Sequence, residues 1–214
     1  MFIPVRVDVP MDRRPWVNYT IIIVTVATTV LAWFDAEVFD RLAGFGTSCL
    51  LHIGLVHLIG NMLFLWVFGN AVNYKFGQVG YLGLYIACAL MGDLAHHYVF
   101  SSGTVVGASG AINGVMGAFL VFFPRNDVSI FWMIWYRPGI SQLSSMWMIL
   151  FWIAWDLFFL IRSAPTQVAH WAHVGGFLTG FIIALVCAFT GLIKPTQDEQ
   201  TLLEVLGISR RSTS

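Results

Sequence analysis

The chain has 214 residues, of which 58% are hydrophobic and only 10% are charged, whereas proteins in general average about 45–50% and about 25%. So few charged side chains cannot cover the surface of a soluble globular fold. The 11 basic and 11 acidic residues cancel and form no basic block, which excludes nucleic-acid binding as the main activity. The composition therefore predicts one membrane-embedded domain.

Six long hydrophobic segments follow one another along the chain, and each approaches or exceeds the roughly 18–20 residues that a helix needs to cross a bilayer. We expect helices rather than strands, because lipid offers no water to an open backbone and these segments do not alternate polar with apolar residues. The sequence thus predicts an all-α polytopic membrane protein with an N-terminal segment 1–16, a six-helix membrane domain 17–193 and a C-terminal tail 194–214. The six segments are 17–34, 54–72, 79–99, 104–123, 145–161 and 168–193.

The distribution of basic residues predicts the orientation of these helices. Only two basic residues, Arg41 and Arg162, lie on one side of the predicted membrane, and the other nine lie on the opposite side. Cytoplasmic loops carry the excess of Lys and Arg, so both termini should be cytoplasmic, in what we expect to be the cell (plasma) membrane. The second, fourth and sixth segments then run from the outer face inward. The basic residues on the cytoplasmic side are Arg6, Arg13, Arg14, Lys75, Arg125, Arg137, Lys194, Arg210 and Arg211.

Two regions outside the spans carry patterns of their own. Residues 35–53 mix charged with apolar side chains, which is typical of an interfacial element at the outer surface. The tail after Pro195 is polar, and we expect a short helix around Leu202 to Leu206. We also expect this tail to be exposed, so that removing residues 197–214 costs neither stability nor activity.

Polar side chains gather at one depth of the predicted membrane domain. His57 and Asn61 lie four residues apart on one face of the second helix, Ser109 lies in the fourth helix and His173 in the sixth. At 1.5 Å per residue, all of them fall roughly 5–10 Å inside the outer surface. A polar residue inside lipid is costly, so this coincidence predicts a functional site.

Small residues predict that the fourth and sixth helices pack closely. They recur at every fourth residue, as Gly110, Gly114 and Ala118 in one helix and as Gly176 and Gly180 in the other. Such stripes allow two helix backbones to approach, which would bring Ser109 within hydrogen-bond reach of His173. A serine hydroxyl is a poor nucleophile alone, and an imidazole is the common base that activates it. The pattern therefore favours a catalytic serine with a histidine base.

These residues also have structural interpretations. Ser109 could be one more small residue in the packing stripe, and His57 and Asn61 could make interhelical polar contacts of about 1–2 kcal/mol at most. We expect structural or rim positions for His52 and His170, which lie nearer the outer interface.

Two acidic residues within the predicted spans have no assigned role. Asp93 and Asp156 would each need a partner or a proton in lipid. Either could orient His173, but no spacing links them to it, so the sequence assigns that role to neither.

Three motifs occur in order across the second to sixth segments. They are His52 followed by His57-xxx-Asn61, then Gly107-Ala108-Ser109-Gly110, then Ala172-His173 followed by Gly176-xxx-Gly180. Together they resemble the rhomboid family of intramembrane serine proteases. The resemblance implies a six-helix core with a Ser109–His173 catalytic dyad. It also implies an oxyanion site formed by the side chains of His57 and Asn61 and by the Ser109 amide.

The resemblance further implies an endopeptidase that cleaves transmembrane segments of other membrane proteins near the outer face. Its partners would be those proteins and the lipid bilayer, and it would need no metal and no organic cofactor. Water must reach the serine from outside, and we expect His52, Gly107 and Gly110 to provide access for water or substrate.

Two positions depart from the family pattern. Ala43 and Gly44 stand where many relatives carry Trp-Arg in the outer loop, and Asn73 stands where a Glu is common after the second span. The first departure puts in question a loop-fastening role for that Arg. The second puts in question a polar contact on the cytoplasmic side.

Two other classes of function remain open. A rhomboid-like protein could bind transmembrane helices without cutting them, although an intact Ser109–His173 pair argues against this. A small transporter or histidine-based metal carrier would need a continuous polar pathway, and the inner halves of these helices are nearly uncharged. The HExxH string of many metalloproteases does not occur in the chain.

Overall fold

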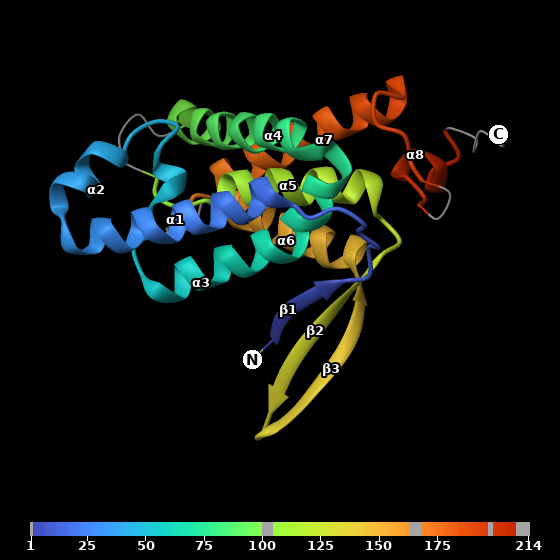
Figure 1. Cartoon of the computed structure of the whole chain (residues 1–214), viewed down its shortest axis with the longest axis horizontal. Coiled ribbons are helices and arrows are strands. Elements are labelled where there is room, and N and C mark those ends of the chain that lie inside the picture. The colour runs from blue at the N-terminus through green and yellow to red at the C-terminus, as the bar shows by residue number, and fades with distance from the viewer. Residues whose placement is uncertain (1, 100–104, 163–167, 197–198, 209–214) are drawn as a thin grey trace.

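The computed structural model describes residues 2–99, 105–162, 168–196 and 199–208. Figure 1 shows a bundle of helices with a small sheet at one end. Four of the described helical stretches are long and apolar enough to cross a membrane, namely Trp16–Phe34 (α1), Leu55–Val99, Ser145–Arg162 (α6) and His170–Thr190 (α7). A shorter apolar helix, α5, covers Ser109–Phe122.

The stretch Leu55–Val99 bends back on itself rather than forming one rod. Its 45 residues would be about 67 Å long as a straight helix, more than twice the roughly 30 Å of bilayer hydrocarbon. It contains α3 (Leu55–Phe64), a π-helical turn over Leu65–Gly69, and α4 (Asn70–Val99), in which Gly77 has a non-helical φ of 71°. Glycine adopts such a φ at little cost. Figure 1 shows the chain turning at this end of the bundle, so that α3 and α4 run in opposite directions.

Each of the six predicted segments overlaps a helix, but the number of membrane crossings stays a prediction. Helix α5 has 14 residues, about 21 Å at 1.5 Å per residue, which is shorter than a straight crossing of the hydrocarbon. Residue 104, where we expected the fourth segment to begin, lies outside the described residues. So do residues 197–198 and 209–214 of the expected tail 194–214.

The prediction of an all-α fold is wrong at one end of the bundle. Three antiparallel strands form a sheet there in the order β1 (Phe2–Val7), β2 (Asp127–Ile134) and β3 (Arg137–Ser144). Strand β2 is rich in β-branched and aromatic residues, as suits a strand. Trp135 and Tyr136 between β2 and β3 both have positive φ, as in a two-residue hairpin turn. The pairing of β1 with β2 joins segments far apart in the chain, which local periodicity does not reveal.

The region 35–53 contains a short helix. Helix α2 (Ala36–Leu42) begins at Asp35, whose carboxylate accepts a hydrogen bond from the Glu37 amide at 2.9 Å, and no residue of α2 is buried. A 3₁₀ turn over Ser48–Leu50 follows. An exposed amphipathic element of this kind is compatible with an interface, and its depth in the membrane stays a prediction.

Helix α5 lies at the centre of the bundle and packs against both α4 and α7. Apart from Ser109 and Asn113 its side chains are apolar, and nearly all of its residues are buried. Glycines permit the contact with α7, since a Cβ atom on Gly176 would lie 1.9 Å from the carbonyl oxygen of Gly110. A Cβ atom on Gly180 would lie equally close to Gly114, at 1.9 Å. The predicted close approach of the fourth and sixth segments is therefore confirmed.

The C-terminal tail is bound to the bundle. The predicted short helix is present as α8 (Leu202–Val205). Glu199 forms an ion pair with Lys75, and the two side chains are only 7% and 4% exposed. Leu203 is also buried. The expectation of an exposed tail is therefore wrong. The described part of the tail covers Lys75, and a buried charge of this kind needs the partner that Glu199 supplies.

Candidate active site

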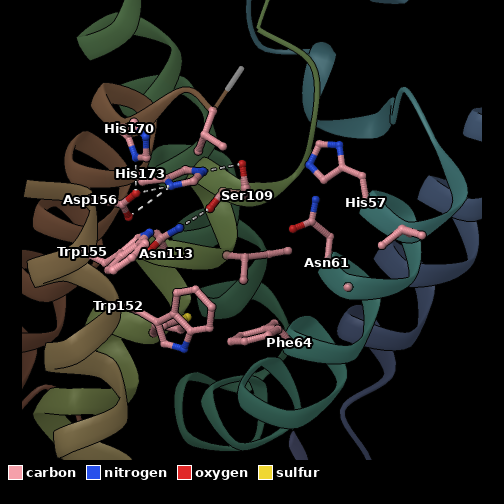
Figure 2. Close-up of a pocket in the computed structure, with 15 residues that line it drawn as sticks. His57, Asn61, Phe64, Ser109, Asn113, Trp152, Trp155, Asp156, His170 and His173 are labelled. Carbon is pink, nitrogen blue, oxygen red and sulfur yellow. Dashed lines mark hydrogen bonds and ion pairs between the residues drawn. The ribbon is translucent and has the colours of Figure 1, made fainter. Parts of the chain in front are cut away.

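A cavity of about 340 Å³ lies among α3, α5, α6 and α7 (Figure 2). Most of its exposed wall is apolar, and seven polar side chains also line it. An apolar pocket with a few convergent polar groups is the usual form of a binding or catalytic site. The polar side chains are His57, Asn61, Ser109, Asn113, Asp156, His170 and His173.

Ser109 is the first residue of α5, so its amide N–H has no partner within the helix. Two residues earlier, Gly107 has a φ of 136°, a conformation that favours glycine. The Gly107 N–H donates to the carbonyl oxygen of Ser48 at 3.1 Å. A Cβ atom on Gly107 would lie 2.8 Å from Cε1 of His57. Glycine at this position therefore lets the chain pass close to His57 and begin α5 at the cavity.

His173 reaches Ser109 from α7. Its Nε2 lies 2.9 Å from Oγ of Ser109, and Figure 2 shows the two side chains facing each other. Because α7 begins at His170, His173 lies in the first turn of its helix, as Ser109 does in α5. Asn113, one turn further along α5, donates from Nδ2 to the Ser109 carbonyl oxygen at 2.9 Å. The predicted hydrogen-bond reach between Ser109 and His173 is therefore present.

Asp156 on α6 extends this row of hydrogen bonds through a contact with His173 that the sequence did not predict. Its Oδ1 and Oδ2 lie 3.0 and 3.1 Å from Nδ1 of His173. Its Oδ1 also lies 2.5 Å from Nδ1 of His170. Asp156 and His170 are both buried, so His170 does not occupy the rim position that was one of its expected roles. One signal in the sequence points to this contact: Asp156 and His173 flank the segment that joins α6 to α7.

His52 contacts Asn61 from behind the cavity wall. Asn61 Nδ2 donates to Nε2 of His52 at 2.8 Å, and the Ala108 amide donates to the same nitrogen at 3.4 Å. Because Nε2 accepts both bonds, the ring proton of His52 lies on Nδ1, which faces Oγ1 of Thr29 at 3.3 Å. Burial and the neighbouring His57 lower the pKa of His52 to about 4. Its ring is therefore neutral near pH 7.

His52, Gly107 and Gly110, which we expect to provide access for water or substrate, are not among the residues that line this cavity, and that role stays a prediction. His52 is 1% exposed and accepts the bonds just described. Gly107 is buried against His57, and Gly110 faces α7, where a Cβ atom would lie 3.3 Å from the carbonyl oxygen of Ala172. These residues shape the backbone around Ser109. The apolar lining instead includes Val56, Phe64, Trp152 and Trp155.

Asp93, for which the sequence assigned no role, fastens the segment before α3 to α4. Its Oδ2 accepts a hydrogen bond from the Gly46 amide at 2.8 Å and one from Oγ of Ser48 at 3.3 Å. The Ser48 carbonyl oxygen in turn holds the Gly107 amide. This carboxylate therefore fastens the loop around Gly46 to α4.

The side chain of Asn73 also has two hydrogen-bond partners. Its side-chain oxygen Oδ1 accepts a hydrogen bond from the backbone N–H of Asn18 at 3.0 Å, and its Nδ2 donates to the Gly77 carbonyl oxygen at 3.2 Å. An amide thus maintains a buried polar contact between α1 and α4.

Asp156, His170 and His173 lie close enough to hold a cation on distance alone, since one ligand atom from each lies within 4.8 Å of the others. Hydrogen bonds already account for most of these atoms. Both Nδ1 atoms face the carboxylate, and the second nitrogen of His173 faces Ser109. Among the described residues, Nε2 of His170 is buried without a hydrogen-bond partner.

Comparisons with known proteins identify the family. A family model described as a Rhomboid domain matches residues 39–189. RHOMBOID-like protein 6, mitochondrial, of Arabidopsis thaliana is 34% identical over 140 residues, which cover 65% of this chain and 42% of that protein. Rhomboid protease GluP of Bacillus subtilis is 32% identical over 166 residues, with coverages of 75% and 28%. Rhomboid protease GlpG of Klebsiella pneumoniae is 27% identical over 162 residues, with coverages of 75% and 54%.

The matched part of the chain thus spans between 28% and 54% of the length of these three relatives. The family model, by contrast, covers most of the chain, and its range includes His57, Asn61, Ser109 and His173. The chain belongs to the rhomboid family.

Proposed function

We propose that this protein is an intramembrane serine endopeptidase that cleaves transmembrane segments of other membrane proteins near the outer face. The observation that carries the proposal is the 2.9 Å contact between Nε2 of His173 and Oγ of Ser109 at the wall of an apolar cavity. A nucleophile and a base within hydrogen-bond reach are the signature of covalent catalysis. Two relatives named rhomboid proteases, GluP and GlpG, support this class of reaction.

In the proposed mechanism His173 acts first as the general base and then as the general acid. Its Nε2 removes the proton from Oγ of Ser109 as this oxygen attacks the scissile carbonyl carbon. The imidazolium then gives the proton to the leaving amine. The same nitrogen then takes a proton from a water molecule whose oxygen attacks the acyl carbon, and it returns that proton to Oγ of Ser109 as the acyl–oxygen bond breaks. No step calls for a metal or an organic cofactor.

The negative oxygen of the tetrahedral intermediate needs N–H donors, and we assign three. One is the Ser109 amide, which the start of α5 leaves without a helical partner. The others are the side chains of His57 and Asn61, which line the same cavity and face it from α3 in Figure 2. Nδ2 of Asn61 has two hydrogens, so one remains for the substrate while the other bonds to His52.

A substrate helix has to unwind locally before it reacts, because each carbonyl in a helix is held within its own ladder of hydrogen bonds. We therefore expect small and helix-weakening residues near the cleavage point. The apolar wall formed by Phe64, Trp152 and Trp155 suits the side chains that flank such a site in a transmembrane segment.

We further propose six membrane crossings in the cell membrane, with both termini in the cytoplasm. Figure 1 supports this arrangement, since the chain enters and leaves the bundle near the end that carries the sheet, and α2 lies at the opposite end. Helices α5 and α7 begin toward the α2 end. Ser109 and His173 then lie in the outer half of the membrane, with lipid and transmembrane proteins as partners.

Cleavage of a generic transmembrane substrate in proteoliposomes tests the proposal. Ser109→Ala and His173→Ala should each abolish turnover, and the double variant should be no worse, because nucleophile and base act as one unit. A fluorophosphonate probe should label the wild type but not Ser109→Ala. Appreciable turnover by Ser109→Ala would rule out the serine mechanism. A wild type that binds transmembrane helices but neither cleaves nor reacts with the probe would favour a non-cleaving binder.

A further inference from the structure

Asp156 lies on the far side of the His173 ring from Ser109. Its carboxylate oxygens are 3.0 and 3.1 Å from Nδ1 of His173, while Nε2 of the same ring is 2.9 Å from Oγ of Ser109. Figure 2 shows Asp156, His173 and Ser109 in a row, contributed by α6, α7 and α5. Asp156 is 6% exposed, so bulk water does not compete strongly for its oxygens.

This geometry selects the ring tautomer that a general base requires. A neutral imidazole carries one N–H, and an ionised carboxylate can only accept hydrogen bonds. Asp156 therefore holds the proton on Nδ1 of His173, which leaves the lone pair of Nε2 facing Ser109. After Nε2 takes the serine proton, the carboxylate lies beside a charged imidazolium and stabilises it.

His170 holds the carboxylate in this orientation. Its Nδ1 donates to Oδ1 of Asp156 at 2.5 Å, and its ring stacks on Phe159 with the centroids 5.1 Å apart and the planes at 4°. Nδ1 of His170 is the ring nitrogen that faces the carboxylate, and its Nε2 faces no hydrogen-bond partner among the described residues. Two imidazole N–H groups on one carboxylate suit its ionised form and restrict its rotation.

We propose that Asp156 is a positioning residue for the reaction, so that the site is a Ser109–His173–Asp156 triad rather than a dyad. The proposal rests on the proposed serine endopeptidase activity and deepens it. Asp156 acts through His173 and does not itself touch the scissile bond. The competing interpretation is that Asp156 only joins α6 to α7.

Asp156→Asn tests the proposal, because the amide has nearly the size of the carboxylate. One acceptor oxygen becomes an NH₂ donor, which favours the proton on Nε2 of His173 and so removes the base. We expect kcat to fall by about 10²–10⁴ while KM changes by only a few-fold. The matched control is Asp40→Asn, which removes an exposed carboxylate on α2 and should leave both constants unchanged.

A spectroscopic measurement separates positioning from packing. Nitrogen NMR on isotopically labelled histidine reports which ring nitrogen of His173 carries the proton. We expect Nδ1–H in the wild type and a shift toward Nε2–H in Asp156→Asn. A purely structural role would lower the Tm of Asp156→Asn, yet the folded variant would keep a kcat within a few-fold of the wild type.

The outcomes distinguish this proposal from the proposed function. Near-wild-type kcat in folded Asp156→Asn, or Nε2–H at His173 in the wild type, would overturn the triad. Absence of Ser109-dependent turnover in the wild type would instead overturn the endopeptidase, and the NMR measurement would still decide whether Asp156 holds His173. If Asp156→Asn does not fold, the wild-type NMR measurement alone gives that decision.

Discussion

One added methyl group at Gly176 should push α5 away from α7 and move Ser109 out of alignment with His173, which should lower kcat. The new Cβ atom would lie 1.9 Å from the carbonyl oxygen of Gly110 and 2.7 Å from its carbonyl carbon. Ordinary contacts are about 3.5–4.0 Å, so the helices have to move apart by roughly 2 Å. A catalytic constellation tolerates only about 0.5 Å, and a misplacement of about 1 Å can cost 10²-fold in rate.

Gly176→Ala should therefore lower kcat by about 10² or more and also lower the Tm, because the same contact packs the helices and aligns the two side chains. Gly180→Ala creates the same clash one turn further from the site, with a Cβ atom 1.9 Å from Gly114. It should lower the Tm as much and kcat less. Gly83→Ala on α4 is the matched control, since a Cβ atom there meets nothing within 4 Å.

The assay is cleavage of a transmembrane substrate in proteoliposomes, with thermal unfolding followed on the same preparations. Gly83→Ala should keep full activity and gain at most about 1 kcal/mol of helix stability. Full activity and an unchanged Tm in Gly176→Ala would refute the argument that close approach of α5 and α7 matters. A lower Tm with unchanged kcat would refute the step from packing to alignment.

Asn61→Ala should lower kcat by about 10²–10³ if its amide meets the oxyanion, yet shift the Tm little, because membrane hydrogen bonds average about 0.6 kcal/mol; a large loss of Tm with unchanged kcat would contradict this. Glu199→Gln should cost about 3–5 kcal/mol of unfolding free energy, because Lys75 stays buried without its counter-charge. Removing residues 197–214 should cost less, since water then reaches Lys75, and equal thermal stability of all three chains would show the ion pair to be dispensable. His52 has a pKa of about 4 in the folded chain and about 6.5 when unfolded, so the unfolded chain takes up the proton first as the pH falls. Its contribution is complete above about pH 6.5 and is lost between about pH 6.5 and 4, roughly 3 kcal/mol in all; unfolding should show a loss over this range that His52→Gln lacks, and a flat wild-type profile would contradict it.

The position of the candidate site follows from two independent signals in the sequence. Counting from helix starts puts Ser109 and His173 at one depth, because both lie on helices that run the same way with a rise of 1.5 Å per residue. The glycines add the facing direction, since Gly110 and Gly176 can approach only if α5 and α7 turn these sides to each other. Depth and direction together are enough to predict that Ser109 and His173 meet, as they do in the 2.9 Å contact between Oγ and Nε2.

Neither the depth count nor the glycine stripes predict the sheet, the docking of the tail or the burial of His52, because each of these depends on other contacts. Strand propensity is visible in 127–134, but its partner β1 lies near the other end of the chain. The ion pair of Glu199 likewise joins distant segments. His52 precedes α3 by a few residues, which suggests a rim position, yet Asn61 and the backbone before Ser109 close over it.

Asp156 illustrates why a partner on an antiparallel helix escapes such counting. Helix α6 runs opposite to α5 and α7 in Figure 1, so the depth of Asp156 must be counted back from the end of α6 at Arg162. Helix ends read from sequence are uncertain by about two to four residues, or roughly 3–6 Å. That error exceeds the tolerance of a hydrogen bond of 3.0 Å. An ionisable residue near the end of an antiparallel neighbour therefore warrants testing as a partner of His173 even where no spacing links the two.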